Sequence, residues 1–400
     1  MADNGQGLRR RLPVGPLTAH SEDRFRYRIG VNLTWLVPGV VGGSEEYTIR
    51  LLKGMGACLP SDIGVQLYAR GELIEQYPEL VERYSIVRCP TANSKPARVA
   101  LEQTWLANAS RGDDIVHHAG GTVPYVRLRP GIVTIHDLQP LDMPENFDAV
   151  KRRWLHHALP YAVRAARLVL CPSEFTARRL RDLLDVDGSR IRVVLHGHSA
   201  KAQSGPQGAA SSDPVERFGR YLLYPAIAYP HKRHVDVVRA VAGLGQAFAD
   251  LNVVFTGRPG PELASVLGEA AKLGIGDRVH AIGRVPEVDL DALYRSAQAL
   301  VFPSAYEGFG NPALEAMSAG CPVIASDGGA LPEVIGDAGL QFPVGDVLAL
   351  AGAISDIVGD PVLADAIRTR GLARAARFDS GIAAEQLAAV YCELADTGPN

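Results

Sequence analysis

Two glutamates, Glu307 and Glu315, are separated by seven residues in a stretch that predicts a strand, a loop and a helix. The apolar run ending at Phe302 predicts a buried strand, and Asn311 with Pro312 predicts a helix start, with Asn311 as the N-cap. A carboxylate one turn into that helix, as Glu315 would be, can accept hydrogen bonds from a diol such as a ribose. Without this context, the pair could equally be two solvated helix-entry carboxylates.

The loop between this predicted strand and helix contains Gly308, Phe309 and Gly310. The first N–H groups of a helix have no partner within it, so they would point out of the sheet edge. Groups of this kind bind phosphates and other hydrogen-bond acceptors. The stretch therefore predicts a site for a phosphorylated or sugar-containing ligand at the carboxyl end of a strand.

Polar residues also follow other predicted strands. The β-branched run 132–135 is followed by His136 and Asp137, and Lys232 and Arg233 come shortly after a later predicted strand. Each has a structural alternative, since a histidine after a strand is often only a hydrogen-bonded core residue and an isolated lysine is usually solvated. Ligands of parallel α/β folds bind at the carboxyl ends of strands, so these residues are candidates for one common site.

Two glycines, Gly42 and Gly43, follow the first predicted strand, and Ser44 is the expected N-cap of the next helix. The glycines either let the backbone approach a ligand or serve a tight turn. A dinucleotide-binding fingerprint, GxGxxG, would have to lie at this turn. The sequence at 39–44 is GVVGGS, which lacks a glycine at the second and third glycine positions of this fingerprint. This argues against a nicotinamide dehydrogenase.

Strands and helices alternate through both halves of the chain, which is typical of parallel sheets covered by helices on both faces. The first half is expected to contain strands at 27–33, 65–68, 115–118, 132–135, 167–171 and 191–195, and helices at 45–55, 147–166 and 174–184. The second half is expected to contain strands near 221–226, 252–256, 279–282, 298–302 and 322–325, and a last helix at about 381–395. The predicted fold class is α/β, with two Rossmann-like domains facing each other across a cleft.

Composition divides the chain into five expected parts. Residues 1–26 are expected to be a loose leader and 27–198 a first Rossmann-like domain. The Ser-, Ala- and Gly-rich stretch 199–217 cannot bury an apolar face and predicts a linker. Residues 218–378 are expected to form a second Rossmann-like domain, and 379–400 a C-terminal helix.

The stretch 301–317 resembles the E-x7-E signature of the retaining GT-B glycosyltransferases of family 4, also called glycosyl transferases group 1. The likeness covers about residues 27–395 and extends to motifs at 42–43, 134–138, 230–232, 294–297 and 330–339. Two of these, 134–138 and 230–232, are most similar to the forms in mannosyltransferase-type members. The resemblance implies a GT-B fold in which 27–198 is the acceptor domain, 218–378 is the nucleotide-sugar donor domain and 379–400 packs back on the first domain.

The resemblance also implies roles for the candidate residues, of which His136, Glu307 and Lys232 would be catalytic. Glu315 would bind the donor ribose, and Glu307 would contact the transferred sugar near its 3- and 4-hydroxyls. Lys232 would neutralise the donor diphosphate, a task suited to a compact ammonium group. His136 would lie near the 6-hydroxyl of the reacting sugar, and Gly43 would let the backbone approach the phosphate.

Further donor contacts are implied for four loop residues, Gly308, Phe309, Gly310 and Asn311. On the acceptor side, the resemblance implies Gly42 and Asp137. The chain departs from the family pattern at one position, because many members carry an arginine six residues before the lysine and this chain has Ala226. Arg233 is expected to supply the missing charge at the donor, with Arg258 as the alternative.

The expected activity is a retaining transfer of a hexose, with mannose favoured, from a nucleotide-diphosphate sugar to a glycan, lipid-linked or small-molecule acceptor. GDP-mannose is the favoured donor and a UDP-sugar is the alternative; no cofactor is expected. A GT-B sugar-nucleotide epimerase and a catalytically silent sugar-nucleotide-binding protein would share the fold and are the alternative functions.

No metal site is expected. The Asp-x-Asp triplets at 185–187 and 289–291 are spelt like the metal motif of another transferase fold. The first is interpreted as a polar turn, and the second as a helix start with Asp289 as the cap. His196 and His198 have no third ligand at helical spacing, so we interpret them as part of the loop after the last strand of the first domain.

Bulk composition narrows the partners and the compartment. The five cysteines contain no C-x-x-C pair, which argues against a disulfide framework or a zinc knuckle and favours a reducing compartment. A net charge of −3 argues against a nucleic-acid partner. No apolar run approaches the roughly 18 residues of a membrane helix, and no secretory signal is recognised. The expected location is cytoplasmic, with peripheral contact at the inner face of the membrane as a further expectation. Residues 1–200 carry 26 Lys and Arg against 21 Asp and Glu, which fits either an anionic surface or ordinary solvated arginines.

Overall fold

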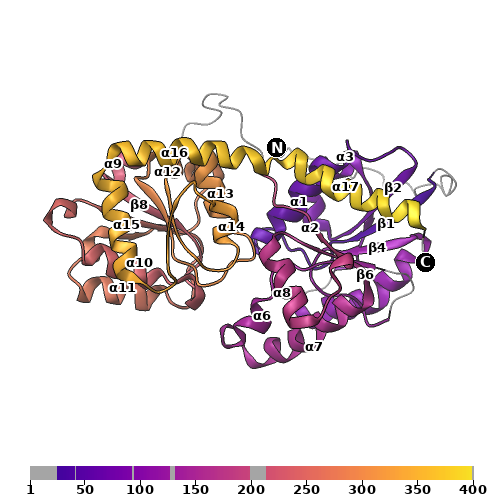
Figure 1. Cartoon of the computed structure of the whole chain (residues 1–400). Helices are drawn as coiled ribbons and strands as arrows, with labels where there is room; N and C mark the ends of the chain where they lie inside the picture. The colour runs from indigo at the N-terminus through magenta and orange to yellow at the C-terminus, as the bar shows by residue number, and fades with distance from the viewer. Residues whose placement is uncertain (1–24, 41, 92–93, 127–130, 199–212, 399–400) are drawn as a thin grey trace, which may run out of the picture.

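The computed structural model describes residues 25–40, 42–91, 94–126, 131–198 and 213–398. Two parallel sheets, one of seven strands and one of six, stand side by side with helices on both faces of each (Figure 1). The expected leader at 1–26 lies outside the described residues except for its last two. Most of the expected linker at 199–217 also lies outside them, and its described end is the start of a short helix, α9 (Pro214–Phe218).

The N-terminal sheet has the strand order β3-β2-β1-β4-β5-β6-β7, and all of its pairs are parallel. Its strands are β1 (Tyr27–Asn32), β2 (Ile63–Ala69), β3 (Ser85–Arg88), β4 (Ile115–His118), β5 (Gly131–Thr134), β6 (Ala166–Cys171) and β7 (Ile191–Val193). In sequence order, the strands first extend from β1 to the edge at β3. They then extend from β4, on the other side of β1, to the opposite edge at β7. Ligands of such sheets bind beside this reversal, outside the carboxyl ends of the strands.

The helices of the N-terminal domain connect these strands. They are α1 (Gly43–Met55), α2 (Gly71–Gln76), α3 (Glu79–Arg83), α4 (Lys95–Leu101), α5 (Ala107–Ala109), α6 (Gln139–Asp142), α7 (Ala149–Ala165) and α8 (Glu174–Leu184). A π-helical turn, Glu102–Leu106, lies between α4 and α5. Three of these helices, α1, α7 and α8, each come after a strand and a loop. These loops lie at the edge of the sheet where the carboxyl ends of the strands meet.

The C-terminal sheet has the strand order β10-β9-β8-β11-β12-β13 and is also parallel throughout. Its strands are β8 (Tyr221–Pro225), β9 (Asn252–Thr256), β10 (Val279–Ala281), β11 (Ala299–Phe302), β12 (Val323–Ser326) and β13 (Leu340–Phe342). Beside α9, its helices are α10 (His234–Ala242), α11 (Leu263–Lys272), α12 (Glu287–Ser296), α13 (Asn311–Ser318), α14 (Leu331–Ile335), α15 (Val347–Gly359) and α16 (Pro361–Ala375).

None of the helices in the described part of the chain is, by itself, both long enough and apolar enough to cross a membrane. The segments Val347–Gly359 and Pro361–Phe378 meet that condition only as a pair, and they are bent by 98° at the break between them. The apolar side of α15 is buried in the core of the C-terminal domain, where Leu350, Ile354 and Ile357 pack against the sheet.

Two expected helix caps are wrong, one by two residues and the other by one, because a glycine is the N-cap of each helix. Gly42, not Ser44, is the N-cap of α1 and has φ 83°, and Gly310, not Asn311, is the N-cap of α13 and has φ 111°. Residues other than glycine rarely adopt such positive φ values. A glycine can therefore set the angle at which the chain enters a helix that no polar side chain caps. Asp289 is likewise not a cap, since α12 begins two residues earlier.

The chain crosses between the domains twice, and the two crossings lie side by side. The first crossing begins after β7, and the second joins α16 to the last helix, α17 (Ser380–Thr397). The backbone N–H of His198 donates to the Phe378 carbonyl at 2.7 Å, and the N–H of Ser380 donates to the His198 carbonyl at 3.2 Å. Figure 1 shows α16 and α17 running in succession along one side of both domains.

The last helix belongs to the core of the first domain. Leu387 and Tyr391 of α17 are 1% and 0% exposed, and they share a hydrophobic cluster with residues of α1 and β1. The Tyr391 hydroxyl lies 2.7 Å from Nδ1 of the buried His117. The N-terminal domain therefore depends on a segment that is more than 180 residues away in the sequence.

We predict that Leu387→Ala lowers the free energy of unfolding of the N-terminal domain by about 2–4 kcal/mol, because it leaves a cavity between α17 and α1. The measurement is urea unfolding followed by circular dichroism. Ile382→Ala is the matched control, since Ile382 lies on the same helix with 44% of its surface exposed, and it should have little effect. Equal effects of the two substitutions would contradict the packing of α17 described above.

Candidate active site

A cleft of about 470 Å3 lies between the carboxyl ends of the strands of the two sheets. Eleven of the twelve site residues expected from the sequence line it: Gly42, Gly43, His136, Asp137, Lys232, Glu307, Gly308, Phe309, Gly310, Asn311 and Glu315. They come from loops after β1, β5, β8 and β11 and from the start of α13. The exception is Arg233, which does not line the cleft.

The two domains touch at Gly308. A methyl group built on this residue would lie 2.3 Å from the carbonyl oxygen of His136 and 2.9 Å from Cβ of Asp137. Both distances are shorter than real carbon contacts, so only glycine fits here without moving the backbone. The Ser173 hydroxyl, at the N-cap of α8, donates to the Gly308 carbonyl at 2.7 Å. The loop after β11 is thus held against two strand ends of the other domain.

Further contacts across the cleft surround this approach. The Glu333 carboxylate accepts hydrogen bonds from the backbone N–H groups of Glu174 and Phe175, at 2.8 and 2.9 Å. These N–H groups open α8, where a carboxylate is favoured because the N-terminal end of a helix carries partial positive charge. The Tyr306 hydroxyl donates to Asp142 at 2.8 Å. The loop after β11 and the start of α14 are therefore held to the first domain by contacts beside Gly308.

Glu307 and Lys232 form an ion pair in the floor of the cleft. The Lys232 ammonium lies 2.5 Å from the Glu307 carboxylate, and the two side chains are only 19% and 13% exposed. The Tyr224 hydroxyl holds the backbone of the lysine by donating to its carbonyl at 2.8 Å. The ammonium group can therefore reach an anionic ligand from a fixed position, and the carboxylate can accept hydrogen bonds from hydroxyl groups.

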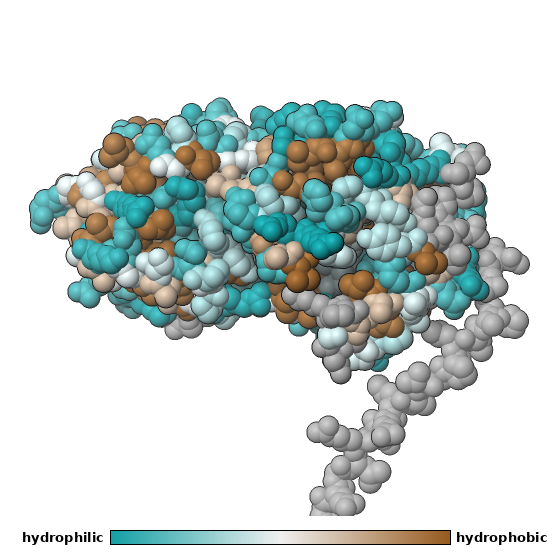
Figure 2. Space-filling view, turned by 90° about the horizontal axis from the view of Figure 1, so that it is seen from below, coloured by the Kyte–Doolittle hydropathy of each residue, from teal (hydrophilic) through white to brown (hydrophobic). Residues whose placement is uncertain are grey.

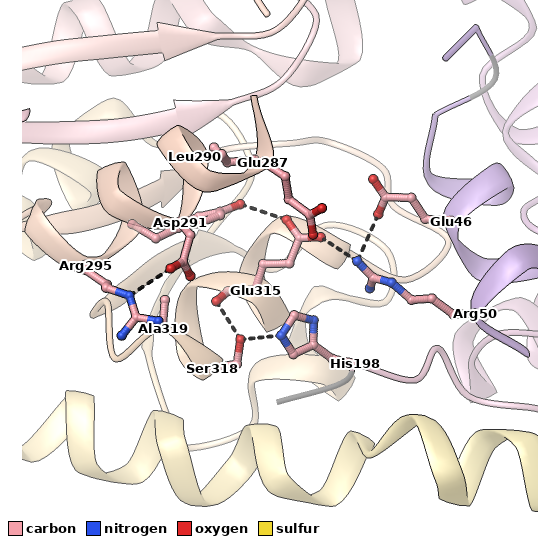
Figure 3. Close-up of a pocket in the computed structure, with 11 residues that line it drawn as sticks. Glu46, Arg50, His198, Glu287, Leu290, Asp291, Arg295, Glu315, Ser318 and Ala319 are labelled. Carbon is pink, nitrogen blue, oxygen red and sulfur yellow. Dashed lines mark hydrogen bonds and ion pairs between the residues drawn. The ribbon is translucent and has the colours of Figure 1, made fainter. Parts of the chain in front are cut away.

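Glu315, on α13, lines both this cleft and a smaller pocket that adjoins it, where it lies between two other groups (Figure 3). The Tyr294 hydroxyl donates to one of its oxygens at 3.1 Å, and the Arg50 guanidinium lies 3.5 Å from the other. Arg50 belongs to α1 of the first domain and also lies 3.4 Å from Glu46. Burial, and secondly the nearby Glu46 charge, raise the pKa of Glu315 to about 7.

His136 is held as a neutral imidazole. Burial lowers its pKa to about 4. Its Nε2 donates to the Ala119 carbonyl at 2.8 Å, which places the ring proton on that nitrogen. The Nδ1 atom is buried and has no hydrogen-bond partner among the described residues. Tyr47 packs edge-on against the ring, with centroids 5.5 Å apart.

Asp137 turns back toward its own backbone. One of its carboxylate oxygens accepts a hydrogen bond from the N–H of Gln139 at 3.0 Å, so the side chain stabilises the turn into α6. Burial raises the pKa of this carboxyl group. The residue lines the cleft on the side of the first domain, next to the point where Gly308 approaches.

The expected replacement for the missing arginine at Ala226 is not found at Arg233. Its guanidinium is 2.5 Å from Asp236 of the same helix start, and Asp236 is 2% exposed on its side chain. Arg258, the alternative, donates instead to the Val40 carbonyl of the first domain at 2.9 Å. Arg284 likewise donates to the Gly39 carbonyl at 3.4 Å. These last two arginines tie the glycine loop after β1 to the second domain.

Two residues of the site were missed by the sequence analysis. Arg50 is four residues after Glu46 on a helix, a spacing that also fits an ordinary surface pair. His196 was assigned only to a loop, yet it lines the cleft and stacks on Phe309, with ring centroids 4.6 Å apart and planes 14° from parallel. Its position three residues after the end of β7 was the available indication.

No aspartate of either Asp-x-Asp triplet lines the cleft, although Asp291 lines the pocket that adjoins it at Glu315. Asp185 ends α8 with a left-handed conformation, and Asp187 accepts a hydrogen bond from the N–H of Ser189, so the first triplet forms a turn as expected. Asp291 pairs with Arg295 one helical turn later at 2.9 Å. Within the described ranges, no group of three or more His, Cys, Asp or Glu side chains could hold a metal ion.

Comparison with known proteins links this geometry to sugar transfer. Residues 217–374 match the family described as glycosyl transferases group 1, and residues 41–200 match glycosyltransferase family 4. O-antigen chain mannosyltransferase B of Escherichia coli is 30% identical over 319 residues, which cover 76% of this chain and 78% of that protein. MMP alpha-(1->4)-mannosyltransferase of Mycolicibacterium hassiacum is 28% identical over 316 residues, covering 74% of this chain and 75% of the relative.

Solved structures agree on the architecture. HepE of Anabaena, solved in complex with UDP and glucose, superposes with a TM-score of 0.72 over 92% of this chain and 100% of its own, at 19% sequence identity. The α/β class and the GT-B arrangement predicted from the sequence are confirmed.

We predict that Glu315→Gln stabilises the ligand-free protein at pH 8 by about 1–3 kcal/mol and has a smaller effect at pH 5. A carboxyl group whose pKa is raised in the folded state stays protonated there to a higher pH than in the unfolded state. The free energy of unfolding therefore falls as the pH rises from the ordinary glutamate pKa to about 7. The glutamine side chain of the Glu315→Gln variant does not titrate, so the variant does not show this fall. Urea unfolding at both pH values measures it.

The control is Glu385→Gln on the exposed side of α17, which should change stability equally little at pH 5 and pH 8. A Glu315→Gln protein less stable than the parent at pH 8 would contradict the prediction. It would mean that Arg50 and Tyr294 stabilise the charged carboxylate more than burial destabilises it.

Proposed function

This chain belongs to the family-4 glycosyltransferases, the glycosyl transferases group 1, and on that premise we propose the finer details of its sugar transfer. The transferred sugar is a hexose, with mannose favoured, and the donor is a nucleotide-diphosphate sugar, with GDP-mannose favoured. Transfer retains the anomeric configuration, needs no metal ion, and delivers the sugar to a glycan or lipid-linked acceptor. The names of the similar proteins support mannose, since O-antigen and MMP mannosyltransferases are among them.

One observation carries the proposal: two cation–carboxylate pairs of low exposure lie between the domains, one in the cleft and the other in a pocket that adjoins it at Glu315. Lys232 pairs with Glu307, and Arg50 approaches Glu315. A diphosphate needs a cation, and a ribose and a hexose need acceptors for their hydroxyl groups. The two pairs offer both kinds of group, and the N–H groups at the start of α13 add a favourable site for negative charge.

In the proposed donor complex, Glu315 accepts hydrogen bonds from the ribose hydroxyls and Lys232 carries the diphosphate charge. Glu307 contacts the hydroxyls of the transferred sugar near the 3- and 4-positions. The approach of Gly308 to His136 then sets the distance between this sugar and the acceptor side. Gly42 and Gly43 lie on the rim of the same cleft, where a backbone without side chains leaves room for the phosphates.

We propose a front-face reaction for the chemical step. The bond from the anomeric carbon to the diphosphate oxygen breaks, and the acceptor oxygen bonds to that carbon on the same face. The acceptor proton passes to the departing diphosphate oxygen, and Lys232 with the α13 N–H groups stabilises the negative charge that develops there. No protein group needs to become covalently attached in this scheme.

The state of two first-domain residues supports this scheme over its competitors. His136 has a pKa of about 4, which makes it a weak base at neutral pH, so we assign it to contacts with the sugar rather than to proton transfer. Asp137 accepts a hydrogen bond from its own turn. A carboxylate held in that way is not oriented as a nucleophile toward the anomeric carbon.

A UDP-sugar is the alternative donor, because HepE, which has a similar fold, was solved with UDP and glucose. A sugar-nucleotide epimerase and a silent binding protein are the alternative functions for the same cleft. An epimerase would change the sugar nucleotide without an acceptor, and a binding protein would do neither. Acceptor-dependent release of nucleoside diphosphate identifies the transferase, and analysis of the sugar nucleotide recovered without acceptor separates an epimerase from a binding protein.

The test is to incubate the protein with GDP-mannose and with UDP-sugars, together with glycan and lipid-linked acceptors. We expect acceptor-dependent release of GDP from GDP-mannose and a product whose new bond has the anomeric configuration of the donor, assigned by NMR. Glu307→Gln should lower kcat by at least about 100-fold because it removes a charged contact to the group that moves. An inverted product would overturn the proposed mechanism.

We predict that the rate of transfer is unchanged by EDTA, because Lys232 and the start of α13 supply the charge stabilisation that a divalent ion would otherwise give. The measurement is the transfer rate of protein treated with EDTA, compared with protein supplied with magnesium or manganese. The corresponding Lys232→Ala protein should lose most of its activity in all conditions. Activity that vanishes with EDTA and returns with manganese would show that a metal takes this role.

A further inference from the structure

Helix α7 has an unusual charge pattern for a surface helix. Its 17 residues include Lys151, Arg152, Arg153 and Arg164 but no aspartate or glutamate. All four basic side chains are exposed, and none of them forms an ion pair with a carboxylate in the part of the chain that the structure describes. A basic surface of this kind, without neutralising partners, attracts anions.

The same helix presents large apolar side chains to solvent. Val150 is 81% exposed and Trp154 is 39% exposed, although Leu155, Leu159 and Val163 on the opposite side are buried. The outward positions follow helical spacing, so they form one continuous strip: Val150, Arg153, Trp154, His157, Tyr161 and Arg164. We call this strip, together with the adjoining Tyr125 and Val126, the α7 face.

The neighbouring loop extends the strip and is fixed to it. Tyr125 and Val126 are 51% and 61% exposed. The Tyr161 hydroxyl donates to the Tyr125 carbonyl at 3.0 Å, and the two rings lie 4.6 Å apart. The α7 face therefore combines apolar, aromatic and basic groups on a firmly packed support, since the buried side of α7 is part of the core of the domain.

We propose that the α7 face docks on the surface of an anionic lipid bilayer. Amphipathic helices with basic residues beside valine and tryptophan lie in the plane of such surfaces, with the apolar side chains among the acyl chains and the cations at the headgroups. Tryptophan and tyrosine are favoured at this interface because one part of each ring system is apolar and the other polar. The charge of the face is complementary to anionic headgroups, and its apolar groups need a layer into which to insert.

The position of the face fits an acceptor that is itself lipid-linked, a point that rests on the proposed function. Helix α6 follows directly after His136 and Asp137 and leads into α7, so the docking surface and the acceptor side of the cleft belong to one short segment. In Figure 1 α6, α7 and α8 lie on the lower side of the molecule, opposite α16 and α17. Figure 2 views that lower side and shows apolar surface interspersed with strongly hydrophilic surface.

The test compares binding of the full chain to vesicles of phosphatidylcholine alone and to vesicles with about one third phosphatidylglycerol, by co-sedimentation without donor or acceptor. We expect binding only to the anionic vesicles, weakened by raising the salt concentration. Arg153→Glu/Arg164→Glu and, separately, Trp154→Ala should each reduce the vesicle affinity at least about tenfold. Circular dichroism melting checks that the variants are folded.

The matched control is Arg370→Glu/Arg377→Glu, which changes the net charge by the same amount at exposed arginines on and beside α16. It should leave vesicle binding close to that of the parent. Equal loss in both double variants would mean that only net charge matters and would overturn the assignment to the α7 face. Equal binding to neutral and anionic vesicles, or no binding to either, would overturn it as well.

Two further readouts separate this proposal from others. Sedimentation velocity tests for self-association, and a change of oligomeric state in Trp154→Ala would mean that the face joins two copies of the chain instead. Transfer to a water-soluble acceptor, measured without vesicles, should be the same in the α7 variants and the parent. If the parent transfers no sugar to water-soluble or to lipid-linked acceptors, the proposed function fails, and the vesicle-binding experiment still decides the membrane proposal independently.

Discussion

The close approach of Gly308 to the carbonyl oxygen of His136 is the contact on which the rest of the site depends. The loop after β11 can lie against the strand end of the first domain only because residue 308 has no side chain. Ser173 then fixes the same residue through its carbonyl, and Glu333 fixes the neighbouring helix start. Residues that are far apart in the sequence are thereby placed around one cleft.

Electrostatics in that cleft follow from its enclosure. Ion pairs that are shielded from water gain little net stability, because each charge has lost its hydration. The Lys232–Glu307 and Arg50–Glu315 contacts are of this type, with low exposure on both members. They are better explained as groups kept ready for a polar, anionic ligand than as supports for the fold. A ligand that supplies phosphate oxygens and hydroxyl groups can take over contacts that these side chains now make with each other.

The sequence was sufficient to predict the architecture and most of the cleft lining, and the physical reason is that parallel strands bring their carboxyl ends to one edge. His136 and Lys232 each follow a strand of a different sheet. The resemblance to GT-B proteins implied that the two sheets face each other, and this placed the two residues at one cleft. The same reasoning had no access to contacts made from the middle of a helix, so Arg50 was missed. Arg233 has an acidic neighbour three residues later, and this local partner holds it outside the cleft. Short strands such as β3 and β13 also gave no usable pattern, because three or four residues are too few to show a period and the strands are completed by pairing with longer neighbours.

The return of α17 to the first domain affects the order in which the protein can fold during synthesis. The ribosome releases β1 and α1 early, but the helix that covers them emerges only after the whole second domain has been made. Domains of most proteins fold in turn as they leave the ribosome. Here the second domain can complete its own core first. The apolar surface of α1 and β1 that Leu387 and Tyr391 later cover stays exposed to solvent until then. The first domain to be translated is thus the last to be completed, and the nascent chain is the form in which this protein is most exposed to aggregation and most dependent on chaperones.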